Sequence, residues 1–213
     1  MSLLNYKKNH MNFINTWQEY IEKNLLNLIN DPLEGNFYSS HLKKTKEPAM
    51  FYKQKNIVNL IELLKPKNIL EIGFNAGFST LLMKIIDPEI NMTCIDINSH
   101  SYVIPCYKQI CKDYKNIKLI LKNSTIALPE LIEMKLKFDI IHIDGDHNVK
   151  QAEKDLNFCL SLCTSKSVII IDDTNLQSIN DLCEKYIHKK AVKEYVFSKV
   201  ECEKYKHRFL EVL

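Results

Sequence analysis

The pattern of apolar positions predicts a helix near the N-terminus. Over residues 11–29, apolar side chains recur at steps of three and four, at Ile14, Trp17, Ile21, Leu25 and Leu28. This spacing puts them on one face of an amphipathic helix. The apolar face needs a partner, and the sequence leaves two open: the chain's own domain, or a second copy of the chain in a homodimer.

A second helix is predicted after a polar stretch. Residues 33–50 form no periodic pattern and contain Pro48, which favours a loop or lid. Apolar residues then recur at helical spacing up to Pro66, at Ile57, Leu60, Ile61 and Leu64.

From residue 68 onward, short apolar runs alternate with helical patterns. Strands are predicted at Asn68–Ile72, Met92–Asp96, Ile117–Leu121, Asp139–Ile143 and Val168–Asp172. Helices are predicted at Phe78–Ile86, Tyr102–Tyr114, Ala127–Met134, Val149–Cys163 and Ile179–Lys189. Strands that are apolar almost throughout, each followed by a helix, indicate a parallel sheet covered on both faces.

Two further strand-like runs, Val192–Ser198 and Arg208–Leu213, end the chain without a helix between them. An antiparallel hairpin is the simplest interpretation. The sequence therefore predicts an α/β fold, with a mainly parallel seven-stranded sheet, a C-terminal antiparallel hairpin and helices on both faces. We expect residues 1–50 to form an N-terminal helix and lid segment, and residues 51–213 to form the main domain.

Composition narrows the class of protein. A net charge of +3 is too small to indicate nucleic acid or a membrane surface as the main partner. No run approaches the ~18 apolar residues of a membrane-spanning helix. Seven cysteines, an odd number with no CxxC pair, favour a reduced chain in the cytoplasm over a disulfide framework or a zinc site.

The turn after the first predicted strand is a candidate ligand site. In "NILEIGFNAGFSTLLM", Gly73 and Gly77 bracket the turn into the next helix, whose free N–H groups suit an anionic group. Ser79 adds a hydroxyl donor. Asn75 stands where the dinucleotide pattern has glycine, which argues against NAD or FAD. The alternative is a tight turn that binds no ligand.

Two further residues at strand ends are candidates for a nucleoside. Asp96 follows Gly77 by 19 residues, close to the ~20 expected for an acid that binds ribose hydroxyls. Ser124 follows the third strand and could reach an adenine edge. Each also has a structural explanation, since Asp96 could be a solvated strand-end acid and Ser124 a helix cap.

Three acids follow the fourth and fifth strands. Asp144 comes directly after one strand, and Asp172 and Asp173 end the next. Neighbouring parallel strands lie about 4.8 Å apart, so these carboxylates are expected to converge and to repel one another unless a cation lies between them. Oxygen ligands suit Mg²⁺ or another divalent cation. Alternatively, the acids cap a helix and bind loop amides.

His147 lies three residues beyond Asp144, over the same sheet edge. An imidazole with an ordinary pKa of about 6.5 can accept a proton near neutral pH, so His147 is a candidate general base. Asp146 is a candidate for orienting His147 or for binding a cofactor. His142 lies inside the strand and is expected to be a packed or hydrogen-bonded core residue.

With these motifs together, the chain resembles class I S-adenosylmethionine-dependent methyltransferases of Rossmann-like fold. It is most similar to the metal-dependent O-methyltransferases, which include a catechol and caffeoyl-CoA group and a macrolide-sugar and aminocoumarin-sugar group. "EIGFNAGFST" resembles their first motif, "FDIIHIDGDH" their fourth-strand motif and "IIIDDTN" their fifth-strand acid pair. The resemblance covers about residues 48 to 213.

The resemblance implies roles for the residues that match. Glu71, Gly73, Asn75 and Ser79 would hold the methionine part of S-adenosylmethionine, with Asp96 on its ribose. Gly77, Ser124 and Asp144 are further candidates for binding this cofactor. Asp144, Asp172 and Asp173 would bind Mg²⁺, which would chelate two adjacent oxygens of a small-molecule acceptor. Asp144 and His147 would then be the catalytic residues.

Two departures bear on the acceptor. Catechol-type members have lysine where this chain has His147, and Asp-Asn where it has Asp172-Asp173, which favours a sugar or vicinal-diol hydroxyl over a phenol. Residues 36–52 are the candidate lid over the acceptor. A nucleotide-binding oxidoreductase, a catalytically inactive binding protein of the same fold, and an RNA or protein methyltransferase are the alternatives.

Overall fold

A single sheet forms the centre of the computed structural model, which describes residues 3–34, 37–39, 44–202 and 204–213, with the backbone alone for residues 3–10. Seven strands occur in this described part of the chain: β1 Asn68–Ile72, β2 Asn91–Asp96, β3 Ile117–Leu121, β4 Phe138–Ile143, β5 Cys163–Ile171, β6 Val192–Glu194 and β7 Arg208–Val212. Their order is β3-β2-β1-β4-β5-β7-β6.

The first five strands are parallel, and β7 runs antiparallel to both β5 and β6. The predicted fold class is therefore confirmed, terminal hairpin included. The strand order reverses beside β1, because the chain moves outward to β3 and then returns to β4. In sheets of this kind, the carboxyl ends of the strands on either side of the reversal form the usual ligand site.

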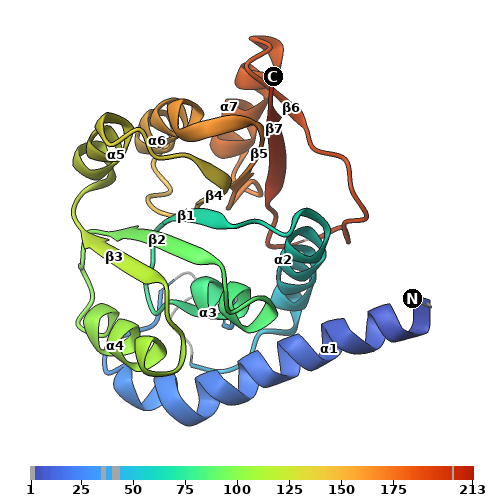
Figure 1. The fold of residues 1–213 in the computed structure, drawn as a ribbon, viewed down its shortest axis with the longest axis vertical. Helices are drawn as coiled ribbons and strands as arrows, with labels where there is room; N and C mark the ends of the chain where they lie inside the picture. The colour runs from blue at the N-terminus through green and yellow to red at the C-terminus, as the bar shows by residue number, and fades with distance from the viewer. Residues whose placement is uncertain (1–2, 35–36, 40–43, 203) are drawn as a thin grey trace.

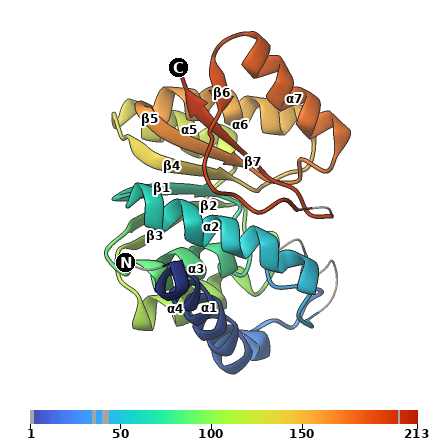
Figure 2. The same ribbon diagram turned by 90° about the vertical axis from the view of Figure 1, so that its right-hand side faces the viewer.

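Helices cover both faces of the sheet (Figures 1 and 2). The α-helices are α1 Leu3–Tyr20, α2 Phe51–Leu64, α3 Phe78–Ile86, α4 Val103–Asp113, α5 Ser124–Glu133, α6 Val149–Leu162 and α7 Gln177–His188. One apolar core lies between the sheet and α1–α4, and a second lies between the sheet and α5–α7. Nearly all side chains of the central strands are buried, which explains their uniformly apolar sequences.

The structure differs from the sequence prediction mainly at element ends. The first helix begins at Leu3 and not near residue 11, and it continues through a π-helical turn, Ile21–Leu25. Strand β5 begins at Cys163, five residues earlier than predicted. β5 pairs with β4 at Cys163 and again from Val168 onward, and the register shifts between these two points. The Ser167 hydroxyl donates a hydrogen bond of 2.6 Å to the Phe138 carbonyl there. This side-chain bond lies where the register shifts, a feature that the apolar pattern does not predict.

The N-terminal helix packs against its own domain. Trp17 is fully buried, and its Nε1 donates a hydrogen bond of 2.7 Å to the carbonyl of Phe78, the first residue of α3. The Tyr20 hydroxyl donates to Asp113 at 2.6 Å, which ties the end of α1 to α4. The homodimer and the boundary at residue 50 stay predictions.

The structure bears on the expectations about cysteines and about membrane-spanning helices. All seven cysteines are free thiols. Among the described residues, no helix combines the length and the apolar character that crossing a membrane requires.

The docking of α1 can be tested through Trp17. Replacing Trp17 with Ala should lower the free energy of unfolding by about 3–5 kcal/mol, because it removes a large buried side chain. Trp17→Phe should cost about 1–3 kcal/mol by leaving the Phe78 carbonyl without its donor. Urea unfolding followed by circular dichroism measures both changes. Met11→Ala, in the same helix but at a side chain 44% exposed, should change stability by no more than about 0.5 kcal/mol.

Candidate functional site

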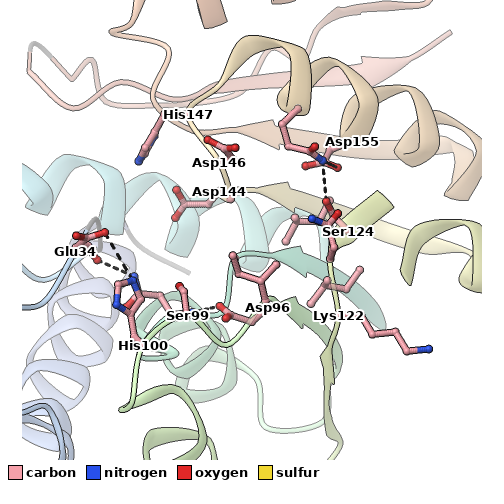
Figure 3. A pocket seen from close by; sticks show the side chains of 18 residues that line it. Glu34, Asp96, Ser99, His100, Lys122, Ser124, Asp144, Asp146, His147 and Asp155 are labelled. Carbon is pink, nitrogen blue, oxygen red and sulfur yellow. Dashed lines mark hydrogen bonds and ion pairs between the residues drawn. The ribbon is translucent and has the colours of Figure 1, made fainter. Parts of the chain in front are cut away.

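A cavity of about 350 Å³ lies at the carboxyl ends of β1, β2, β3 and β4. Its walls include Gly73, Asn75, Asp96, Ser124, Asp144 and His147, so six of the residues predicted from the sequence meet in one place. Figure 3 shows Asp144, Asp146 and His147 on one side of this cavity, and Asp96 and Ser124 on another. The cavity lies at the reversal of strand order, as expected for a ligand site.

The turn after β1 needs glycine for steric reasons. Gly73 has φ +95°, and a Cβ there would lie 2.0 Å from the carbonyl oxygen of Asp144. The first turn and the end of β4 are therefore in direct backbone contact. Gly77, at φ +74°, precedes α3, where a Cβ would meet the ring of Phe74 at 2.4 Å. Asn75 also has positive φ, at 51°. The turn thus needs two glycines and an asparagine, a residue that tolerates this conformation.

The carboxylate of Asp96 is fixed at the end of β2. One oxygen accepts a hydrogen bond from the backbone N–H of Asn75 at 2.8 Å, and the other accepts from the N–H of Asn98 at 2.7 Å. Each oxygen keeps a second lone pair, and the residue lines the cavity. Asp96 can therefore both brace the glycine turn and accept hydrogen bonds from a ligand.

Ser124 belongs to a small polar cluster that the sequence analysis did not identify. Its hydroxyl accepts from Gln151 Nε2 at 3.0 Å, and the same amide nitrogen donates to Asp155 at 2.9 Å. Burial raises the pKa of Asp155, which lines the cavity beside Gln151. Both residues come from α6, where no motif distinguishes them from ordinary surface positions of an amphipathic helix.

Two segments that are far apart in sequence also line the cavity. His100 Nε2 lies 3.7 Å from Glu34 Oε2 at the cavity wall (Figure 3). The side-chain amide of Asn75 donates to the Glu34 carbonyl at 2.7 Å, which joins the segment after α1 to the glycine turn. Neither Glu34 nor His100 lies in a recognisable motif. The predicted lid over 36–52 falls partly on residues 36 and 40–43, which lie outside the described residues.

Glu71 lies in the core and not on the cavity wall. Its carboxylate is fully buried and accepts hydrogen bonds from the Ser79 hydroxyl at 2.5 Å and from the Thr80 hydroxyl. His142 Nδ1 lies 3.1 Å from the same carboxylate. The network joins β1, α3 and β4, and it confirms that His142 is a hydrogen-bonded core residue. Contact of Glu71 or Ser79 with a ligand stays a prediction.

The acids at the ends of β4 and β5 surround a lysine. The ammonium of Lys53, from α2, forms an ion pair with Asp172, and both side chains are at least 96% buried. Burial alone lowers the pKa of Lys53, but the charges of Asp172, Asp144 and Asp173 outweigh it and raise this pKa, so the ammonium keeps its proton. Desolvation and the neighbouring Asp172 charge raise the pKa of Asp144 well above its usual range.

His147 is paired with Asp173 above this cluster. His147 Nδ1 lies 2.5 Å from Asp173 Oδ2, and the His147 side chain is 59% exposed. The hydrogen bond to Asp173 raises the pKa of His147. Burial alone raises the pKa of Asp173, but the bond to His147 and the Lys53 charge outweigh it and lower that pKa. With Nδ1 directed at a carboxylate, Nε2 is the ring nitrogen left to accept a proton.

The carboxylates can be examined as ligands of a divalent cation. Among the described residues, one atom each from His142, Asp144 and Asp172 lie within 4.8 Å of one another, and His142 Nε2 has no hydrogen-bond partner. These donors suit a divalent ion. Asp173, by contrast, is directed to His147. The Lys53 ammonium already binds Asp172, so in this arrangement the cluster does not fit a second cation.

Comparison with known proteins agrees with the fold. Residues 70–174 match the model of a family described as a methyltransferase domain, a segment just short of half the chain. A protein of Arabidopsis thaliana, provisionally named a caffeoyl-CoA O-methyltransferase, is 32% identical over 90 residues. Those residues are 41% of this chain and only 38% of that relative.

Solved structures extend the similarity to most of the chain. An O-methyltransferase from Bacillus cereus in complex with SAH superposes with a TM-score of 0.65 at 17% identity, over 93% of this chain and 90% of that one. TomG from Streptomyces achromogenes, an O-methyltransferase of tomaymycin synthesis in complex with SAM, gives 0.60 at 17% identity, over 76% and 79%. The chain has the Rossmann-like methyltransferase fold, and the family match supports a methyltransferase.

The close approach of β1 and β4 gives a test of the site's framework. Gly73→Ala should lower the free energy of unfolding by about 2–5 kcal/mol, because the new Cβ overlaps the Asp144 carbonyl in a backbone conformation unfavourable to alanine. Gly145→Ala is the matched control: its Cβ would meet Ile72 Cγ2 at 3.3 Å, and the cost should be about 1 kcal/mol or less. Equal stability of the two variants in thermal unfolding would contradict the proposed contact.

Proposed function

We propose that this chain is an S-adenosylmethionine-dependent O-methyltransferase that transfers a methyl group to a hydroxyl of a small molecule. The observation that carries the proposal is the meeting of the glycine turn, Asp96 and His147, which pairs with Asp173, at one cavity. The methyltransferase family match and the SAM- and SAH-bound structures of similar fold support the choice of cofactor.

The cavity offers separate places for the parts of the cofactor. The ribose hydroxyls would donate to the two oxygens of Asp96, each of which keeps a lone pair. Ser124 and Gln151, at the β3 side of the cavity, would meet the adenine. The Asn75 side of the turn would face the methionine part, beside the N-terminus of α3.

The His147–Asp173 pair supplies the proton transfer. When bound, S-adenosylmethionine offers a methyl group on a positively charged sulfur. His147 Nε2 accepts the proton of the acceptor hydroxyl as the oxygen bonds to the methyl carbon, and the electrons of the broken carbon–sulfur bond remain on sulfur. The Asp173 carboxylate stabilises the imidazolium so formed and fixes the direction of the ring.

The finer expectations from the sequence remain proposals. An acceptor of sugar or vicinal-diol type is proposed from His147 and the Asp172-Asp173 pair alone. Assistance by Mg²⁺ is the sequence-based expectation, and the Lys53–Asp172 ion pair argues against it.

Cofactor binding can be tested through Asp96. Isothermal titration calorimetry should show that the chain binds S-adenosylmethionine and not NAD. Asp96→Asn should weaken this binding about 10- to 100-fold, because an amide replaces a charged acceptor of hydrogen bonds. Glu89→Gln, at an exposed acid just beyond α3, is the charge-matched control and should bind normally. Binding of NAD in preference to S-adenosylmethionine would favour the oxidoreductase alternative.

The His147–Asp173 pair predicts a shift in titration. NMR titration should show a pKa for His147 above the value of an ordinary histidine side chain, because Asp173 stabilises the protonated ring. Asp173→Asn should lower this pKa toward about 6.5. A base must be unprotonated, so activity falls as the pH drops through the His147 pKa. Because Asp173→Asn lowers this pKa, the pH at which the variant loses half of its activity should be lower than in the unmodified chain.

His188, at the far end of α7, is the internal control, and its signal should not respond to the substitution. A His147 pKa that is the same in both proteins would contradict the pair.

A further inference from the structure

The carboxylate cluster at the ends of β4 and β5 already contains a cation. Lys53 projects from the first turn of α2, its side chain is 4% exposed, and its ammonium pairs with Asp172, itself 3% exposed. An ammonium so withdrawn from water is stable only where opposite charge and hydrogen bonds replace its hydration. Asp172 supplies the contact, and the Asp173 carboxylate adds negative charge near the same ammonium.

The surroundings of Lys53 suit an ammonium better than a metal ion. The ammonium lies 5.0 Å from the ring centre of Phe37, over its face. A ring face attracts an organic ammonium and offers no lone pair to a divalent ion that requires oxygen ligands. Phe37 is buried and is held by Gln54, whose side-chain amide donates to the Phe37 carbonyl at 2.5 Å. The Lys53 ammonium is therefore in contact with both the Asp172 carboxylate and the Phe37 ring, beside α2.

A divalent ion would compete with Lys53 for the same carboxylate. Mg²⁺ binds carboxylate oxygens at about 2.0–2.1 Å and needs six ligands in an octahedron. An ion bound to Asp144 and Asp172 would have the Lys53 ammonium as a close neighbour of like charge, in surroundings that screen charge poorly. To admit the ion, the buried lysine would have to leave both its carboxylate and the Phe37 ring.

We propose that the Lys53 ammonium is the resident cation of this cluster, taking the position of a divalent metal, so that the site functions without one. This inference rests on the proposed methyltransferase function and deepens it. With no metal to chelate two oxygens, the acceptor needs only one hydroxyl within reach of His147, and a vicinal pair of hydroxyls is not required. Lys53 is a positioning residue: it holds Asp172, beside Asp173, which orients His147.

The direct test is metal binding by the unmodified chain. Mn²⁺, a paramagnetic ion with the same preference for oxygen ligands, is titrated into the full chain, and free Mn²⁺ is measured by electron paramagnetic resonance. We expect no stoichiometric binding below about 1 mM, with or without S-adenosylmethionine. One Mn²⁺ bound per chain at micromolar concentration, and lost in Asp172→Asn, would overturn the proposal.

The variant Lys53→Met shows whether the lysine is what keeps the metal out. Its removal leaves His142, Asp144 and Asp172 as an open set of donors, so Mn²⁺ affinity should rise about tenfold or more. If the variant unfolds alone, Mn²⁺ should restore the fold, since a ligand of the native state stabilises it. Lys53→Met that neither binds Mn²⁺ more tightly nor is stabilised by it would refute the role of Lys53.

Two controls separate this inference from the proposed function. Lys55→Met, at a partly exposed lysine in the same helix, should leave Mn²⁺ binding as weak as in the unmodified chain. Calorimetry with S-adenosylmethionine is run on the same samples. If the chain binds S-adenosylmethionine and also binds Mn²⁺ at micromolar concentration, only the inference about Lys53 is wrong. If it does not bind S-adenosylmethionine, the proposed methyltransferase function is wrong, whether or not Mn²⁺ binds.

Discussion

The site depends on a buried ion pair between Lys53 and Asp172. The lysine reaches the end of β5 from a helix 119 residues earlier in the chain, and it neutralises a carboxylate that would otherwise be isolated from water. Removing one partner of such a pair typically costs about 3–5 kcal/mol, because the remaining charge is left uncompensated. The pair therefore fixes α2 over the carboxyl edge of the sheet and sets the position from which Asp173 meets His147.

The buried carboxyl group of Glu71, in β1, also joins separate elements of the fold. Glu71 sits in the middle of β1 and draws together Ser79, Thr80 and His142, which belong to α3 and β4. Buried polar groups are costly without partners, and Ser79, Thr80 and His142 Nδ1 together supply partners for the Glu71 carboxylate, which favours one arrangement of these elements. Glu71 thus joins β1 to α3, the elements on either side of the glycine turn, and Asp96 binds the turn itself through the Asn75 N–H.

The carboxyl edge of the parallel strands brings together residues proposed for cofactor binding and residues proposed for proton transfer. Asp96 and Ser124 lie toward β2 and β3, whereas Asp144, His147 and Asp173 lie toward β4 and β5. Parallel strands deliver all their carboxyl ends to one edge, so a nucleoside pocket and a proton-accepting pair can lie side by side. This division is the physical basis for proposing a two-substrate transfer reaction, with the donor at one end of the edge and the acceptor at the other.

The sequence by itself determined the alternation of strands and helices and the polar residues at the strand ends. Apolar periodicity and the glycines of the first turn are local signals, and parallel pairing then places Gly73, Asp96 and Asp144 at one edge without further information. It also predicted a divalent metal ion among the acids, because three converging carboxylates repel one another unless positive charge lies between them. Only the tertiary structure decided that the Lys53 ammonium pairs with Asp172, that Glu71 is turned into the core, and that Gln151 and Asp155 reach the cavity. Lys53 lies on an amphipathic helix with no motif to distinguish it, and only the packing of α2 over the ends of β4 and β5 brings its ammonium to Asp172.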